Sequence, residues 1–117
     1  MDRPLLAYPD FGKSFAVEVD TSKLGLGAIL LQESELGQRA VAYASRLCSP
    51  TEANYSATEI ECVGVIYALH QFRCYVIGRE FTFVSDHKAL RDLNMLPNPS
   101  GRKARWLMIL MEFTYTQ

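Results

Sequence analysis

The segment of residues 56–72 limits the possible folds more than any other part of this 117-residue sequence. It begins with Ser56 and Glu59, which have the spacing of a capping box, where each side chain satisfies a free backbone donor at a helix start. The helix predicted after this cap is apolar on most of its faces. Such a helix must be buried, and we therefore expect it to pack on a β-sheet.

Strand patterns lie on both sides of this helix. Residues 15–20 alternate between apolar and polar side chains with the period of a strand. Two more strands are expected before the helix and two after it, and short helices are predicted near the C-terminus. The expected strands are residues 15–20, 24–31, 39–45, 79–85 and 112–116, with later helices at 87–93 and 102–111. The order βββαβαα(β) indicates an α/β domain with a mixed sheet, whose first three strands form an antiparallel meander.

Length and composition indicate one domain, which we place at residues 15–117 after an extended lead-in of residues 1–14. The net charge of −1 provides no global basic field, so nucleic-acid binding would need a local patch. The cysteines, Cys48, Cys62 and Cys74, lack CxxC spacing and are expected to be reduced core thiols. The longest apolar run is too short to span a bilayer, and a cytoplasmic or nuclear location, without secretion, is expected.

Three acidic residues occupy positions where a protein gains little by burying a carboxylate. Asp20 ends the first strand, Asp86 follows the fourth, and Glu61 interrupts the apolar face of the main helix. An ionised carboxylate leaves water only when something pairs with it. The carboxyl ends of adjacent parallel strands meet at one sheet edge, where ligands of α/β sheets bind. The pattern therefore favours a divalent-metal site, and Mg²⁺ is the usual ion for oxygen ligands.

Each acid also has a structural explanation. Asp20 is compatible with a turn cap, Asp86 with a helix N-cap, and Glu61 with an acid favoured by the helix dipole. Glu18 shares the strand face of Asp20 and is a reserve candidate. Glu59 and Glu61 are two positions apart, which places them about 200° apart around the helix axis, so they cannot both face the sheet. Glu59 is assigned to the capping box.

Basic residues gather at the start of the last predicted helix. Arg102, Lys103 and Arg105 adjoin Trp106, and this cluster is a candidate contact for nucleic-acid phosphates. The polar turn around Asn54 is a second candidate. A solvated helix start with Trp106 in the core is the structural alternative.

Several motifs in order resemble the ribonuclease H domains of reverse transcriptases from Ty3/Gypsy-type long-terminal-repeat retrotransposons. The matching motifs are Val19-Asp-Thr-Ser22, Gly25-Leu-Gly-Ala28, Thr58-Glu-Ile-Glu-Cys62, Phe83-Val-Ser-Asp-His-Lys-Ala-Leu90 and Gly101-Arg-Lys-Ala-Arg-Trp106. The resemblance covers essentially residues 4–117. It implies a ribonuclease H-like fold, with a mixed five-stranded sheet in the order 3-2-1-4-5 and flanking helices.

This resemblance also implies a function. Asp20, Glu61 and Asp86 match the family's catalytic carboxylates, which hold two Mg²⁺ ions, with Mn²⁺ as a substitute. The implied reaction is endonucleolytic hydrolysis of the RNA strand of RNA–DNA hybrids during reverse transcription, with metal-activated water as the attacking group. The implied partners are the hybrid and the polymerase portion of the same polyprotein, and no membrane is involved.

The sequence differs from the family pattern at its C-terminus. Family members continue to a last helix that bears a fourth catalytic Asp, and this sequence ends at Gln117. We therefore expect a C-terminally truncated domain with an incomplete second metal site, impaired hydrolysis and a partly uncovered sheet face. The alternative hypothesis is a non-catalytic ribonuclease-H-like module, which serves as a tether or nucleic-acid-binding surface in a degenerate or co-opted retroelement.

Overall fold

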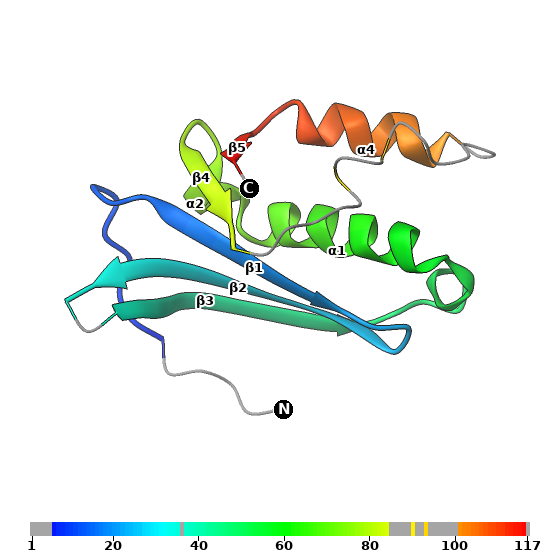
Figure 1. Ribbon diagram of the computed structural model, residues 1–117, viewed down its shortest axis with the longest axis horizontal. Coiled ribbons are helices and arrows are strands. Elements are labelled where there is room, and N and C mark those ends of the chain that lie inside the picture. Colours follow the sequence, from blue (N-terminus) through cyan, green and yellow to red (C-terminus); the bar gives the residue numbers. More distant parts are fainter. Residues whose placement is uncertain (1–5, 36, 85–89, 91–92, 94–100, 117) are drawn as a thin grey trace.

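A computed structural model describes residues 6–35, 37–84, 90, 93 and 101–116 of the chain. A single five-stranded sheet has the order β3-β2-β1-β4-β5 (Figure 1). This order confirms the predicted fold. The strands are β1 (Phe15–Thr21), β2 (Gly25–Ser34), β3 (Gly37–Leu47), β4 (Glu80–Phe83) and β5 (Thr114–Thr116).

Strand direction divides the sheet into two parts. The pairs β1–β2 and β2–β3 are antiparallel, as predicted for the meander. The pairs β1–β4 and β4–β5 are parallel. Parallel strands need a crossover connection, and the chain between β3 and β4 contains α1 (Ala57–Gln71) and the short helix α2 (Arg73–Val76). The sheet is therefore mixed, with β1 at its centre.

Helix α1 covers the sheet on the face that carries Phe15, Val17 and Val19. Its capping box is present as predicted, because Ser56 and Glu59 each donate a backbone N–H to the other's side chain at 3.1 Å. Helix α4 (Arg102–Leu110) packs beside α1 on the same face (Figure 1). The buried core joins these elements, with Val65, Ala68 and Leu69 of α1 fully buried against β1, β2 and β4.

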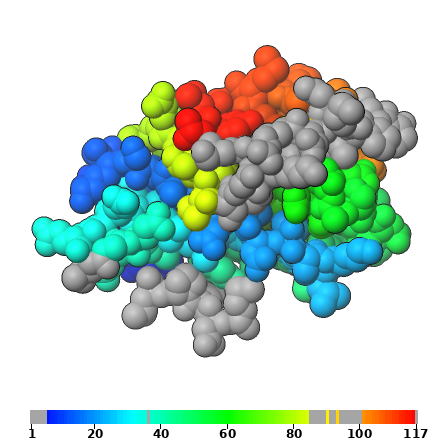
Figure 2. All heavy atoms as spheres, viewed as in Figure 1, coloured from blue at the N-terminus to red at the C-terminus, as the bar shows by residue number. Residues whose placement is uncertain are grey.

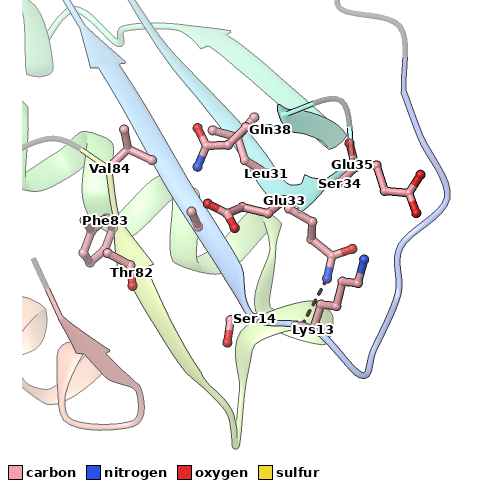
Figure 3. A pocket seen from close by; sticks show the side chains of 12 residues that line it. Lys13, Ser14, Leu31, Glu33, Ser34, Glu35, Gln38, Thr82, Phe83 and Val84 are labelled. Carbon is pink, nitrogen blue, oxygen red and sulfur yellow. Dashed lines mark hydrogen bonds between the residues drawn. The ribbon is translucent and has the colours of Figure 1, made fainter.

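The far side of the sheet is more open. Ala16, Leu31 and Val84 line a groove of about 910 Å³ on this face. Figure 3 shows the side chains of Leu31 and Val84 in this groove, together with Glu33 and Lys13. Val84 is 45% exposed. The β2–β3 hairpin (cyan) forms one end of the molecule and α1 (green) the other (Figure 2). Within the described part of the chain, no helix is long and apolar enough to cross a membrane.

Residues 7–14 contain no helix or strand, and hydrogen bonds attach them to the sheet. The buried amide of Gln32 accepts a hydrogen bond from the Asp10 backbone N–H at 2.8 Å and donates to the carbonyls of Asp10 and Lys13 at 2.7 and 3.1 Å. The backbone N–H of Ala7 donates to Ala40 on β3 at 2.7 Å. The lead-in is thus part of the packed structure.

Several sequence predictions need correction. The β2–β3 hairpin is longer than expected, because Glu33 and Ser34 pair with Gln38 and Gly37 instead of forming a loop. The register shift in β2 falls between Leu30 and Leu31. Helix α2 was not predicted. Cys62 alone is a buried core thiol, since Cys48 is half-buried and Cys74 is exposed. The predicted helix at 87–93 lies largely outside the described residues.

Candidate functional site

Asp20 lies one residue before the end of β1 and is exposed. Its neighbours Val19 and Thr21 face α1, and successive side chains alternate between the faces of a strand. The side chains of Asp20 and Glu18 therefore point to the other face of the sheet. Glu18, the reserve candidate, is also exposed. A groove of about 620 Å³ beside Asp20 is lined by Ser22, Ser45 and the ends of β1, β2 and β3.

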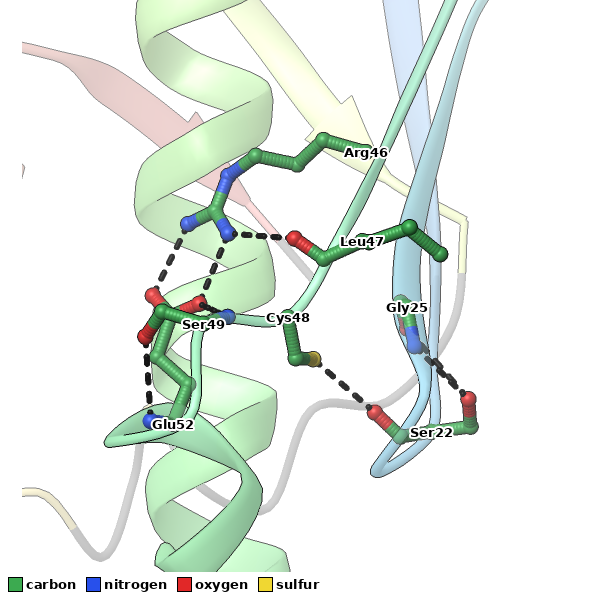
Figure 4. A network of polar contacts seen from close by, with 7 residues as sticks. All are labelled: Ser22, Gly25, Arg46, Leu47, Cys48, Ser49 and Glu52. Carbon is green, nitrogen blue, oxygen red and sulfur yellow. Dashed lines mark hydrogen bonds and ion pairs between the residues drawn. The ribbon is translucent and has the colours of Figure 1, made fainter.

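The turn after Asp20 is built around Ser22. The hydroxyl of Ser22 accepts hydrogen bonds from the backbone N–H groups of Leu24 and Gly25 at 3.2 and 3.1 Å. Serine commonly closes turns in this way. The sulfhydryl of Cys48 donates to the Ser22 carbonyl at 3.4 Å, which attaches the turn to the segment after β3 (Figure 4). The carboxyl end of β1 is thereby held in place.

Glu61 is half-buried near the start of α1. One helical turn later, Gly64 sits so close to β1 that an added Cβ would lie 2.9 Å from Val19 Cγ1 and closer still to Thr21 Cγ2. The contact brings the helical turn after Glu61 against the residues that flank Asp20.

The third predicted acid, Asp86, lies outside the described residues. Among the residues that the structure describes, no group of three His, Cys, Asp or Glu side chains is placed to hold a metal ion. The two described acids, Asp20 and Glu61, supply oxygen donors, which suit Mg²⁺ and Mn²⁺. The chemistry of these donors therefore fits the predicted ions, and two acids alone do not complete a site.

An ion pair fixes the connection from β3 to α1. The guanidinium of Arg46 makes two hydrogen bonds to the carboxylate of Glu52, at 2.7 and 2.9 Å, and a third to the Leu47 carbonyl at 3.1 Å (Figure 4). Glu52 begins a 3-10 helix (Glu52–Asn54) and also accepts from the backbone N–H of Ser49. The hydrogen bond from Arg46 is the main reason that the pKa of Glu52 falls to about 2.

A second ion pair joins α4 to the start of α1. Arg102 Nη2 lies 2.5 Å from Glu59 Oε2, and the Arg102 Cζ atom lies 4.4 Å from the centroid of the Tyr55 ring. The pKa of Glu59 is lowered, first by the hydrogen bond from the Ser56 backbone and also by Arg102. No local pattern predicted this contact, because Glu59 and Arg102 are 43 residues apart in sequence.

The two candidate nucleic-acid surfaces lie next to each other. Asn54 is exposed, donates to the Pro50 carbonyl at 3.3 Å, and precedes Tyr55, on which Arg102 stacks. Arg102 and Arg105 line a groove of about 480 Å³ together with Tyr55 and Trp106. Lys103 is half-buried on the same helix turn. The structure therefore unites the basic cluster and the Asn54 turn into one region at the start of α1.

The sheet order and the position of α1 define a domain of the ribonuclease H-like fold. Residues 10–113 match the family described as the RNase H-like domain found in reverse transcriptase, and the chain belongs to this family.

The curated relatives are retroelement polyproteins. The chain is 41% identical over 112 residues to the retrovirus-related Pol polyprotein from transposon 412 of Drosophila melanogaster, covering 96% of this chain and 9% of the relative. It is 31% identical over 117 residues to the transposon Tf2-3 polyprotein of Schizosaccharomyces pombe, covering 96% of this chain and 9% of that polyprotein. These relatives identify a ribonuclease H domain of Ty3/Gypsy-type retrotransposons, and the chain spans about a tenth of their length.

Solved structures support the fold. The foamy viral protease-reverse transcriptase in complex with dsDNA matches with a TM-score of 0.72 at 22% identity, over 96% of this chain and 25% of that chain. The same viral protein in complex with an RNA/DNA hybrid matches with a TM-score of 0.66 at 22% identity, over 96% of this chain and 16% of that chain. At this identity the likeness concerns the fold.

Proposed function

We propose that this domain hydrolyses the RNA strand of RNA–DNA hybrids with divalent metal ions, as the nuclease part of a retroelement polyprotein. The family and the fold support a ribonuclease H domain. The polyprotein relatives support a polymerase portion as its partner. A similar viral protein was solved with an RNA/DNA hybrid, which supports the same class of ligand here.

The register of β1 and β4 carries this proposal. Val17 and Phe83 are partners in the parallel pair, and the Val84 backbone N–H donates to the Val17 carbonyl at 3.0 Å. Asp20 and Asp86 each follow this pair by three residues in the sequence. Two acids at equal sequence distances from one register pair are compatible with a shared metal site beyond the carboxyl ends of parallel strands, where ligands of α/β sheets bind.

Asp20, Glu61 and Asp86 would hold the ions. Bound Mg²⁺ would supply a nucleophile from water and stabilise negative charge on the phosphate. The chain's own contribution is placement: the Ser22 turn holds the end of β1, and the contact of Gly64 with Val19 holds α1 against it. Lys103, Arg105 and Asn54 are proposed to contact the nucleic-acid backbone, and Arg102 would have to leave Glu59 to do the same.

The test is cleavage of an end-labelled RNA–DNA hybrid by the 117-residue chain and by a longer segment of the same polyprotein, with Mg²⁺, Mn²⁺ or EDTA. We expect metal-dependent cleavage of the RNA strand that is stronger in the longer segment. Asp20→Asn, Glu61→Gln and Asp86→Asn should each reduce the cleavage rate by about 10²-fold or more, since each removes a proposed metal ligand.

Glu80→Gln is the matched control, because Glu80 is an exposed acid on β4. It should cleave like the parent. Glu18→Gln separates Glu18 from Asp20 and should have a much smaller effect than Asp20→Asn. Equal cleavage by the parent and Asp86→Asn would show that the metal-site assignment is wrong. Hybrid binding without cleavage in the longer segment would favour the non-catalytic module.

A further inference from the structure

Arg102 is the first residue of α4, and its side chain points to the start of α1. The guanidinium contacts the Glu59 carboxylate at 2.5 Å and stacks on the ring of Tyr55, the residue before the helix cap. The Arg102 and Glu59 side chains are 23% and 16% exposed. A contact this well enclosed holds its partners more firmly than an exposed surface pair does.

Glu59 has two roles in the first turn of α1. Its Oε1 atom accepts the Ser56 backbone N–H at 3.1 Å and closes the capping box, while its Oε2 atom receives Arg102. One turn along α4, Trp106 packs on the cluster of Leu26, Ile60 and Val63. Helix α4 therefore holds the first turns of α1, and Glu61 lies between the residues Ile60 and Val63 that it contacts.

We propose that Arg102 is a positioning residue for Glu61. This inference rests on the proposed function, because it takes Glu61 as a metal ligand. The sheet holds α1 from one side, at the contact of Gly64 with Val19. Arg102 holds the same end of α1 through Glu59. The first turn, with Glu61, then keeps its position relative to β1 and Asp20.

This role differs measurably from a direct phosphate contact. The positive charge of Arg102 is already matched by Glu59. If Arg102 neutralised a phosphate, its loss would weaken hybrid binding. It would also reduce the slope of log binding constant against log salt concentration by about the amount expected for one phosphate contact. If it positions Glu61, its loss leaves the salt dependence unchanged and weakens metal binding.

The experiment compares Arg102→Gln, Arg102→Lys, Glu59→Gln and the double variant R102Q/E59Q in the 117-residue chain. Glu59→Gln is a matched change, because glutamine can also close a capping box. Three quantities are measured: amide hydrogen exchange of residues 57–61 without metal, Mn²⁺ affinity from paramagnetic broadening of the Glu61 amide signal, and the salt dependence of hybrid binding. Arg105→Gln, in the same groove, is the comparison for a phosphate contact.

Arg102→Gln and Glu59→Gln should each speed exchange of residues 57–61 and weaken Mn²⁺ binding, by about three- to tenfold, with an unchanged salt slope. The double variant should be no worse than either single one, because both remove the same contact, and Arg102→Lys should recover part of the loss. A lower salt slope with intact Mn²⁺ affinity, additive losses, or unchanged exchange would each overturn the inference.

The proposed function can fail separately. If the parent neither binds Mn²⁺ near Glu61 nor cleaves a hybrid, the assignment of Glu61 as a ligand is wrong. Hydrogen exchange at the Glu61 amide still decides whether Arg102 holds this turn, since that measurement needs no metal. An unchanged exchange rate in Arg102→Gln would then refute the positioning role on its own.

Discussion

Gly64 on α1 and Val19 on β1 approach so closely that a Cβ on Gly64 would lie 2.9 Å from Val19 Cγ1. Real Cβ atoms essentially never come this near another heavy atom. The helix can therefore reach this depth on the sheet only with glycine at position 64. The contact lies one helical turn after Glu61 and beside Asp20, so it links the packing of the fold to the candidate site.

Gly64→Ala should destabilise the domain by about 1–3 kcal/mol, the usual cost of overpacking a core. Its intrinsic gain in helix propensity, about 1 kcal/mol, opposes part of this loss. Urea unfolding followed by circular dichroism measures the difference. The double variant G64A/T21S should recover only part of the lost stability, because it removes the nearest atom, Thr21 Cγ2, and leaves the close contact with Val19 Cγ1. Unchanged stability in Gly64→Ala would contradict the close contact.

Loss of the Gln32 amide should release the lead-in. In Gln32→Leu the backbone groups of Asp10 and Lys13 lose three hydrogen bonds to the side chain. We expect faster hydrogen exchange at residues 7–13 and a loss of about 1–3 kcal/mol in unfolding free energy. Gln38→Leu is the control, because Gln38 is exposed on the neighbouring strand. Equal exchange rates in the two variants would show that Gln32 does not hold the segment.

The Arg46–Glu52 pair should make stability depend on pH in the acid range. The pKa of Glu52 is lowered from about 4.5 to about 2 in the folded chain. The folded state therefore favours the ionised form, and this stabilisation is complete above pH 4.5 and lost as the pH falls towards 2. Glu52→Gln should unfold with a shallower pH dependence across this range, as measured by urea titrations at several pH values. Glu80→Gln is the comparison, and identical slopes would refute the prediction.

The three cysteines should react with a thiol reagent at different rates. Cys74 is exposed and should be labelled first, followed by the half-buried Cys48. Burial, with a smaller effect of Glu61, raises the pKa of Cys62 to about 12, so its reactive thiolate is scarce. Labelling followed by mass spectrometry should find Cys62 modified only when the chain unfolds. In Cys62→Ala the slowest labelling step, which accompanies unfolding, should disappear. Rapid labelling of Cys62 in the parent chain would contradict its burial.

Local sequence patterns predicted much of the fold. The alternation in β1 and the capping box at Ser56 are properties of neighbouring residues, and both are present in the structure. The choice of Asp20, Glu61 and Asp86 as metal ligands stays a prediction. This choice was based on the ends of strands and on the angular position of residues around the helix. In the structure, Asp20 lies near the end of β1 and Glu61 near the start of α1.

Tertiary structure decided the contacts between residues far apart in sequence. Gln32 binds the lead-in 22 residues away, and Arg102 meets Glu59 across 43 residues. Neither pair leaves a periodic signal, because the partners lie on elements whose relative position depends on the whole packed core. The sequence alone therefore determined the five strands, the main helix with its cap and which acids are candidates. Only the folded chain decided that the basic cluster and the Asn54 turn share one surface, and that Arg102 is held by Glu59.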